Sequence, residues 1–474
     1  MRRTPLLLTT ALALNMTFAA DPTLQSLQNQ INDLQQRLDE AEERADEIEF
    51  EATLSKVKFG LEFSNSISNF NTSNGNGTTN HNNGKFATEL HLNMNAQVND
   101  RTKFSGRLSV MRGWGDMGWS KLPMEISTGR TADGGPIVFL ERAYVDYIIL
   151  NGFHATIGRQ PATDGPGSNL RNNSGRLSTY PALLVNLLGD ALIFTYAPDY
   201  FDVSQLTFRA GYSKFYQWVE GSGSSEHFTG TQKDSDGDLL FVEVEGKLPL
   251  GALGDNLAIL SYIQTINYSV PINTPTLSLG PVNIGDIQVV NLHFENNKML
   301  GLPFSWFVSG SYFNAKADNG DDAARKVASA NGISIETRAQ LDSVVAQSGG
   351  NASLQQLQAA ADRLKLNNEN AFAIHAGARV DLPLDFKIGY EYFHGSRYWY
   401  AFSRPSIHDP LDFRNTRGDV HDIYLIYQLD FNQFLRASYT NIHNKYSNNG
   451  LAFGGADPVD RTAEIFMLMY NLKF

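Results

Sequence analysis

The chain has 474 residues, a formal net charge of −12 and no cysteine. An acidic protein repels phosphate backbones, so this charge argues against nucleic acid as a partner, and the missing cysteines exclude a disulfide framework and thiol chemistry. Charged residues make up only 19% of the chain, which is below the roughly one quarter that is usual for soluble proteins.

The first twenty residues have the pattern of a secretory signal peptide. Met1-Arg2-Arg3 is a short basic start, and the stretch "LLLTTALALNMTFAA" is apolar and ends in small residues. Thr17 and Ala19 fit the small positions that precede a cleavage site. A membrane anchor is the alternative, but the apolar run is short for a spanning helix of about 20 residues. We therefore predict that residues 1–20 are removed and that the mature chain is exported.

Residues 21–52 are predicted to form a coiled-coil segment. Apolar residues alternate at spacings of three and four, as in a heptad repeat, at Leu24, Leu27, Ile31, Leu34, Leu38, Ala41, Ala45 and Ile48. Arg37 and Arg44 then precede Glu42 and Glu49 at positions that pair opposite charges between parallel helices. The pattern predicts a parallel homo-oligomer, and a single amphipathic helix lying on another surface is the alternative.

From residue 53 to 474 the apolar period changes to two, which is the period of a β-strand with one buried face. We predict sixteen strands, an even number as in bacterial outer-membrane barrels, at 54–68, 85–98, 103–112, 137–149, 152–159, 189–197, 204–215, 239–249, 257–267, 286–296, 303–315, 371–381, 385–393, 420–430, 434–443 and 461–474. The expected fold is a 16-stranded antiparallel transmembrane β-barrel that follows the α-helical coiled-coil segment.

The connections between these strands alternate between short and long. Short ones include Asn99-Asp100, Asn151-Gly152 and Asn432-Gln433, and the long ones are 70–84, 113–136, 160–188, 216–238, 268–285, 316–370, 394–419 and 444–460. Outer-membrane barrels have short periplasmic turns and long external loops. Both termini then lie at the short-turn end, which places the coiled coil in the periplasm.

The two faces of the strands predict opposite environments. The last strand places Phe466, Leu468, Tyr470, Leu472 and Phe474 on one face, and we interpret Phe474 and Tyr470 as an assembly signal facing outer-membrane lipid. The other face of the barrel is polar and contains charges of both signs, which need water around them. Two strands, "ALIFTY" and "EIFMLMY", are apolar on both faces, and we expect their inner side chains to lie beneath an inward-folded loop.

The third long loop is the candidate for that inward-folded segment. It is rich in glycine and proline and precedes an apolar patch, and an exposed surface loop is the alternative. Rings of charged side chains set the selectivity of pores. We therefore predict a pore constriction formed by Arg142, Asp146, Arg159, Asp164, Arg171 and Arg176.

Several stretches of the barrel region resemble a known family. The segments "ERAYVDY", "GRQPATDGP", "RLSTYP" and "NTRGD" are similar to those of a family of uncharacterised outer-membrane porins whose members begin with a signal peptide and a short coiled coil. The resemblance covers most of the mature chain. It implies a porin-like protein, and it assigns neither a solute nor catalytic residues.

Two other segments are of interest. "DSDGD" spaces Asp234, Asp236 and Asp238 as a Ca²⁺ loop does, but it lacks the distal glutamate of an EF-hand, so a solvated turn is the favoured interpretation and no cofactor is predicted. Residues 321–367 are rich in Ala, Gln and Leu and predict one or two helices in an external loop.

The sequence favours an outer-membrane porin that allows passive diffusion of small hydrophilic solutes or ions through a water-filled, charge-lined pore. No local spacing pairs a nucleophile with a base, so we predict that the protein is not an enzyme. The alternatives are a substrate-selective channel, a tether whose coiled coil links the barrel to the cell wall, and a barrel enzyme whose site is assembled in space. A trimer is the expected oligomer.

Overall fold

The computed structural model describes residues 35–38, 57–114, 137–198, 204–216, 237–249, 255–274, 277–318, 320–364, 368–448, 452 and 454–474. The predicted signal peptide lies outside this part of the chain. So does the predicted coiled coil, except for residues 35–38, which are helical. The chain divides into two compact units, Met1–Val57 and Lys58–Phe474, and the second unit contains the barrel.

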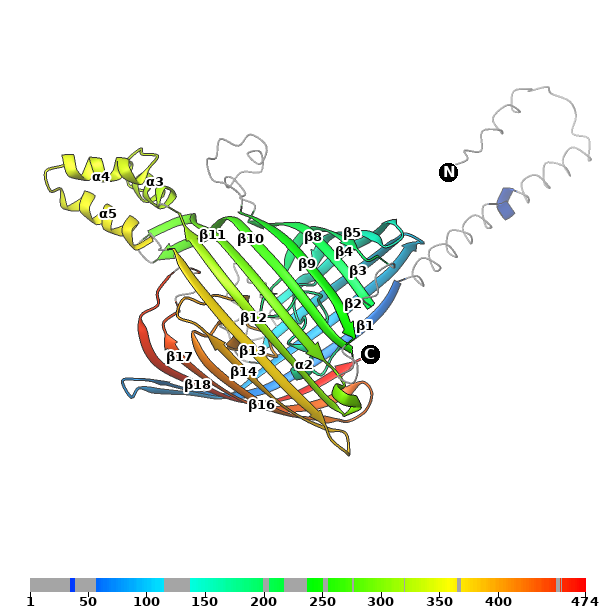
Figure 1. Ribbon diagram of the computed structural model, residues 1–474. Helices are drawn as coiled ribbons and strands as arrows, with labels where there is room; N and C mark the ends of the chain where they lie inside the picture. The colour runs from blue at the N-terminus through cyan, green and yellow to red at the C-terminus, as the bar shows by residue number, and fades with distance from the viewer. Residues whose placement is uncertain are drawn as a thin grey trace, which may run out of the picture. The chain divides into compact units, whose positions relative to one another are not determined.

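The described strands of this unit form a closed antiparallel barrel of sixteen strands (Figure 1), which confirms the predicted fold. The strands are β1 (Val57–Asn74), β2 (Thr79–Asn99), β3 (Thr102–Gly113), β4 (Ile137–Leu150), β5 (Phe153–Gln160), β7 (Gly189–Tyr196), β8 (Ser204–Tyr216), β9 (Gly237–Pro249), β10 (Asp255–Thr274), β11 (Leu277–Asn296), β12 (Phe304–Ala317), β13 (Glu369–Asp381), β14 (Phe386–Gly395), β16 (Gly418–Gln428), β17 (Gln433–Tyr446) and β18 (Pro458–Lys473).

The barrel closes where β1 pairs with β18. Phe63 lies opposite Leu472, and the backbones of Leu61 and Phe474 exchange two hydrogen bonds of 2.7 and 2.9 Å. Tyr470 stacks edge-on against Phe63. The side chain of Phe474 is 68% exposed, as a lipid-facing terminal residue would be, and its role as an assembly signal stays a prediction.

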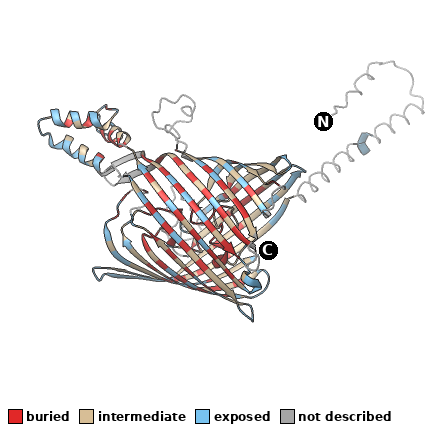
Figure 2. Cartoon of the chain, viewed as in Figure 1, coloured by how far each residue is buried: buried red, intermediate tan, exposed pale blue. Residues whose placement is uncertain are grey.

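Side chains alternate between the lumen and the outside along the strands, and Figure 2 shows this as alternating buried and exposed positions. On β18, Phe466 and Leu468 are exposed, whereas Ile465, Met467 and Met469 are buried. Exposed apolar side chains recur on most strands, among them Val242, Leu260, Leu292, Ile374 and Leu425. This outward apolar surface is what a barrel presents to lipid.

Two hairpins extend farther than the sequence predicts. β1 and β2 continue to Asn74 and Thr79, and β10 and β11 to Thr274 and Leu277, where loops were expected. The first hairpin tip beyond Phe70, "NTSNGNGTTNHNNG", is polar on both faces. A strand with water on both sides has no apolar alternation, so its period gives no signal.

Two segments fold into the lumen. The first, residues 161–188, contains the short helix α2 (Asn169–Asn172) and strand β6 (Val185–Asn186), and we call it the third loop. The second, residues 396–417, contains strand β15 (Phe402–Ser403) and the 3₁₀ turn η4 (Phe413–Asn415), and we call it the second inner loop. The two loops meet where β6 pairs with β15 in parallel.

The inner loops build an apolar core inside the barrel. Leu183, Leu184 and Trp399 of the loops join Ile465, Met467 and other wall residues in one buried cluster. This packing confirms the expectation that strands which are apolar on both faces support an inward-folded loop. The second inner loop was not predicted to fold inward.

The long insertion between β12 and β13 contains three helices, α3 (Asp321–Ser329), α4 (Arg338–Gln347) and α5 (Ala352–Leu364). Their core includes Val327, Leu341 and Ala361, and α4 begins with a capping box of Thr337 and Gln340. The helical character of the insertion is therefore confirmed, with three helices in place of the one or two that the sequence predicts. Within the described residues, no helix combines the length and apolar character needed to cross a membrane.

Candidate pore and its charged lining

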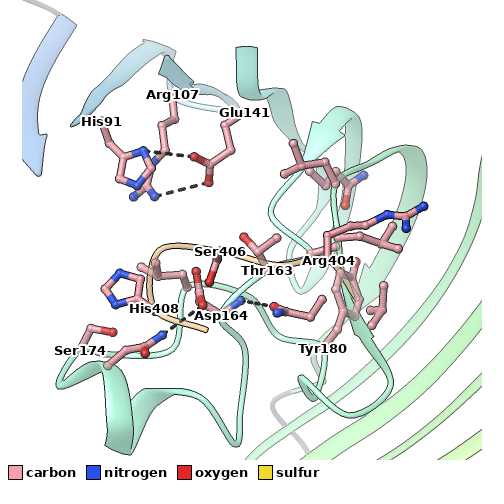
Figure 3. A pocket seen from close by; sticks show the side chains of 18 of the residues that line it. His91, Arg107, Glu141, Thr163, Asp164, Ser174, Tyr180, Arg404, Ser406 and His408 are labelled. Atoms are coloured by element: carbon pink, nitrogen blue, oxygen red, sulfur yellow. Dashed lines mark hydrogen bonds and ion pairs between the residues drawn. The ribbon is translucent and has the colours of Figure 1, made fainter. Parts of the chain in front are cut away.

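A cavity of about 1090 Å³ runs beside the third loop. Its lining includes Gly189 and Leu239 near the long-loop ends of their strands, and Phe431, Asn432 and Phe474 at the short-turn end. The cavity therefore extends along the height of the barrel. One side includes β1–β5, and the other includes the third loop, part of the second inner loop and β7–β9, with further lining residues from β10 and β16–β18. Figure 3 shows His91, Arg107 and Glu141 facing the loop residues Asp164 and His408 across this space.

Arg107 is the central cation of the barrel side of the cavity. Its Nε donates to Asn93 Oδ1 at 2.7 Å, and its terminal nitrogens lie 3.1 Å from Glu62 and 3.4 Å from Glu141. The guanidinium thus joins β1, β2, β3 and β4 through one group. Because the fork of donors is planar and rigid, it also fixes the carboxylates of both glutamates.

His91 extends this network across β2. Its Nδ1 lies 2.7 Å from Ser109 Oγ and 3.2 Å from Glu141, and its Nε2 lies 3.3 Å from Glu89. Ser109 donates a hydrogen bond to Glu141. Charges of both signs therefore lie within a few ångströms of each other along the cavity, as in a hydrated lumen.

A β-bulge places two consecutive charged residues of β4 inside the barrel. The pairing of β3 with β4 shifts between Arg107 and Leu108, so Glu141 has no direct partner. Glu141 and Arg142 are consequently both buried in the lumen, although consecutive strand residues normally point to opposite faces. Of these two residues, only Arg142 is among the constriction residues that the sequence predicts. The adjacent charges in "LERA" interrupt the alternation and were the available signal for Glu141.

Asp164 is the acidic residue that the third loop presents to the cavity (Figure 3). Its backbone N–H donates to Asn186 Oδ1 at 2.9 Å, and its Oδ1 accepts from Asn172 Nδ2 at 3.1 Å. Burial raises the pKa of the Asp164 carboxyl and the carboxylates of Glu89 and Glu141 raise it further, whereas Arg414 and Arg142 act in the opposite direction. Carboxylates of the loop and of the wall therefore act on the same space.

A set of arginines fixes the third loop to the opposite wall. Arg171 of α2 forms an ion pair of 2.8 Å with Asp422 of β16, and both side chains are buried. Arg436 of β17 donates to the carbonyl of Arg171, and Arg379 of β13 donates to that of Leu170, each at 3.0 Å. The carbonyl end of a helix favours such cations, so α2 is held by wall charges as well as by packing.

Two further contacts extend this anchoring. Arg176 pairs with Glu245 of β9 at 3.2 Å. Arg414 of the second inner loop donates to the carbonyl of Gly167 and to Ser168 Oγ, both at 3.1 Å. The third loop is therefore attached on several sides, and the remaining opening is the cavity along β1–β5.

The predicted constriction residues have different placements. Asp164 lines the cavity, and Arg142 is buried in the lumen, where it pairs with Glu141 at 3.4 Å. Arg171 and Arg176 anchor the loop away from the cavity. Asp146 also points inward, but it lies nearer the short-turn end of β4 and accepts a hydrogen bond of 2.6 Å from Thr156. Whether any of them controls permeation stays a prediction.

Arg159 corrects the prediction, because its side chain is on the outer face of the barrel. Ile157, two residues earlier on the same face, is 57% exposed, and Arg159 pairs with the exposed Asp190 of β7 at 2.8 Å. Strand alternation therefore excludes Arg159 from the lumen. Its position at the start of the inward loop suggests the lumen, but closeness along the chain does not determine which face of the strand a side chain occupies.

The arrangement of Ser109, His91 and Glu89 has the contacts of a serine–histidine–acid triad. Ser109, however, is 0% exposed, and its hydroxyl donates to Glu141. A nucleophile must reach its substrate, and this one is enclosed by its own partners. The contacts therefore form a structural hydrogen-bond network.

The aspartates of "DSDGD" are only partly covered by the structure. Asp234 and Asp236 lie outside the described residues, and Asp238 pairs with Lys214 at 2.8 Å and accepts from Tyr212 at 2.6 Å. Within the described part of the chain, no group of three or more His, Asp or Glu side chains is placed to hold a metal ion. Asp238 thus already has a cationic partner from the protein.

The model of a family described as "Protein of unknown function (DUF3373)" matches residues 79–472. No curated protein matches the chain. Among solved structures, the fold is similar to OprB of Pseudomonas putida, with 11% identity, coverage of 90% of this chain and 96% of that one, and a TM-score of 0.46.

Two other solved barrels are similar at the same level. OmpT of Vibrio cholerae in its trimer form has 12% identity, with coverage of 88% and 99% and a TM-score of 0.42. OmpF of Salmonella typhi in complex with daunomycin has 8% identity, with coverage of 87% and 98% and a TM-score of 0.43. These values concern the barrel fold alone.

Proposed function

Since the chain belongs to the DUF3373 family of proteins of unknown function, which assigns it no activity, we propose from its geometry that it is a porin-like channel of the bacterial outer membrane. The observation that carries this proposal is the cavity, which is lined by residues from both ends of the barrel. The outward apolar side chains support the membrane location. The alternative function, a tether whose coiled coil links the barrel to the cell wall, would need no passage through the barrel.

The mechanism is passive diffusion through a fixed constriction. The anchored third loop narrows the lumen, and water and solutes pass between it and the network of Arg107, His91 and Glu141. Because positive and negative groups lie side by side there, they replace part of the hydration of either kind of ion. The enclosed hydroxyl of Ser109 supports a channel in preference to an enzyme.

Planar-bilayer conductance of the purified protein tests this function. The cysteine-free chain allows a single reactive thiol to be placed in the cavity by Thr163→Cys, which the third loop presents there. We expect stable KCl conductance that falls when a cationic methanethiosulfonate reagent modifies this thiol, because the attached group occupies the constriction.

The matched control is Asp190→Cys, whose side chain is on the outer face of the barrel. Modification of this thiol should leave the conductance unchanged. Absence of conductance from correctly folded protein contradicts the channel, and equal effects of both thiols contradict the assignment of the pore to this cavity.

We also propose that the protein forms a homo-oligomer, with a trimer as the expected state. Besides the heptads of residues 24–48, an outward row of alternating charges supports this: Arg159, Asp190, Lys214 and Asp238 lie at successive paired positions of β5, β7, β8 and β9. Such a row suits contact with a second copy better than contact with hydrocarbon.

Chemical cross-linking in outer membranes tests the oligomer. The full chain should give a trimer band, and a variant lacking residues 24–48 should give less of it because the helices no longer hold the copies together. An Asp190→Lys variant, which places three cations in succession, should weaken the remaining association. A strictly monomeric full-length protein contradicts this proposal.

A further inference from the structure

Three neighbouring turns at the short-turn end of the barrel contain leucines that are exposed at the surface. The turns connect β11 to β12, β13 to β14 and β16 to β17. Backbone hydrogen bonds join them. The Asp381 N–H donates to the Pro303 carbonyl at 2.9 Å, and the Gln428 N–H donates to the Asp385 carbonyl at 3.0 Å. The exposed leucines, which we call the leucine tips, are Leu300, Leu302, Leu382, Leu384 and Leu429.

Two of the leucine tips have a backbone conformation that leucine rarely adopts. The φ of Leu300 is +56°, and that of Leu384 is +63°. In this left-handed region the Cβ comes too close to the backbone, so glycine and asparagine are favoured there. Leu384 is followed by Asp385 with a φ of +62°, in a tight hairpin of the kind that usually contains Asn-Gly. Leu384 is 81% exposed, so packing within the chain does not compensate for this conformation.

The leucine tips continue the apolar outer surface of the barrel. Ile388 and Leu425 are exposed on the outer face of β14 and β16. On the same face, Phe386 stacks on Tyr427 with ring centroids 4.7 Å apart. Aromatic residues at this height mark the boundary between hydrocarbon and headgroups in membrane barrels. The tips follow this ring pair within a few residues, so the surface that faces lipid extends directly into them.

The turn between β2 and β3, on the far side of the ring of strands, is polar. It contains Asn99, Asp100 and Arg101, and the Arg101 N–H donates to Asn99 Oδ1 at 2.9 Å. Such residues are favoured where a turn is surrounded by water. The two sides of this barrel end therefore have different surroundings to satisfy, water on one side and an apolar phase on the other.

We propose that the leucine tips insert into the lipid leaflet at the short-turn end and anchor this side of the barrel in the membrane. Transfer of several leucine side chains from water to an apolar environment is favourable, and it offsets the left-handed backbone of Leu300 and Leu384. The insertion is shallow, because Asp385 and Asp430 lie beside the leucines and a carboxylate is costly in hydrocarbon. The inference depends on a barrel that lies in a membrane and not on the passage of solutes through it.

The accessibility of single labels in vesicles tests this inference. The cysteine-free chain allows Leu384→Cys to be labelled alone with a nitrobenzoxadiazole maleimide. The vesicles contain phosphatidylethanolamine, phosphatidylglycerol and the full-length protein only. We expect blue-shifted emission and strong quenching by lipids that carry a nitroxide near the headgroup, because the label lies among the first methylenes.

The matched control is the same label at Asp100→Cys, in the polar turn. Both labels lie at the same end of the barrel, so the orientation of the protein in the vesicle affects them equally. Aqueous iodide should quench the label at position 384 several-fold less than the label at position 100. Equal quenching at the two positions overturns the inference and leaves the leucine tips to a protein partner.

A double variant, Leu300→Asn/Leu384→Asn, tests whether the leucines themselves hold the arc in lipid. Asparagine adopts the left-handed conformation readily, so the turns should still form, and heat-modifiable migration checks the barrel. With the label now at Leu302→Cys, quenching by iodide should increase several-fold relative to a chain that keeps both leucines. Asp100→Asn should leave it unchanged. KCl conductance should not change, since these turns lie outside the constriction. Unaltered shielding at position 302 contradicts the anchor, whatever the conductance.

Discussion

The Asp422→Ala variant should have a larger and noisier conductance than the natural protein. Asp422 is the buried partner of Arg171 on α2, at 2.8 Å. Removing one partner of a buried ion pair leaves the other charge uncompensated, which costs about 3–5 kcal/mol. That cost corresponds to a shift of roughly a hundredfold or more between the anchored and released states of the third loop. The released loop no longer fixes the constriction, so single-channel recordings should show a wider and fluctuating opening.

The double variant Arg171→Leu/Asp422→Leu is the matched control. It removes both charges of the pair together, and apolar replacements of buried pairs are often neutral. The steady conductance of the natural protein should return. A barrel with Asp422→Ala that is folded by heat-modifiable migration and conducts normally would show that the ion pair does not hold the loop.

The barrel is predictable from the sequence because its two determinants are local patterns. The period of two along "KFATELHLNMNAQV" follows from a wall between lipid and lumen, and the alternation of short and long connections follows from the two ends of the barrel. Where a strand leaves the membrane, as at Asn74 and Thr79, the first pattern vanishes and the prediction ends too early. The helical insertion is similarly local, with its capping box at Thr337.

The interior is harder to predict because its contacts join distant segments. Arg171 and Asp422 are 251 residues apart, and no local spacing connects them. Composition nevertheless contained a signal for the second inner loop, since "RYWYAFSRPSIHDPLDF" is too aromatic for a loop in water, and Trp399 and Phe413 are in fact buried. Arg159 shows the opposite case, because its position beside the inward loop suggests the lumen, whereas its parity on β5 places it on the outer face of the barrel.

The Arg107→Gln variant should make the pore strongly selective for cations. Arg107 offsets both Glu62 and Glu141 in the cavity, where Lys473 and Arg142 are further partners of these two glutamates, and the carboxylates of Glu89 and Asp164 line the same space. Glutamine retains hydrogen-bond donors but no charge, so the local field becomes negative, and charged groups around a pore set its ion preference. The reversal potential in a KCl gradient should therefore move several-fold closer to that of K⁺.

Ionic strength and position provide the controls for this expectation. The shift should be large at 0.1 M salt, where the screening length is about 10 Å, and small at 1 M, where it is about 3 Å. Arg159→Gln makes the same chemical change on the outer face of the barrel, where Arg159 pairs with Asp190, and should leave the reversal potential unaltered. If both variants behave alike while conducting normally, ions do not pass Arg107, and the route through the barrel must lie elsewhere than along β1–β5.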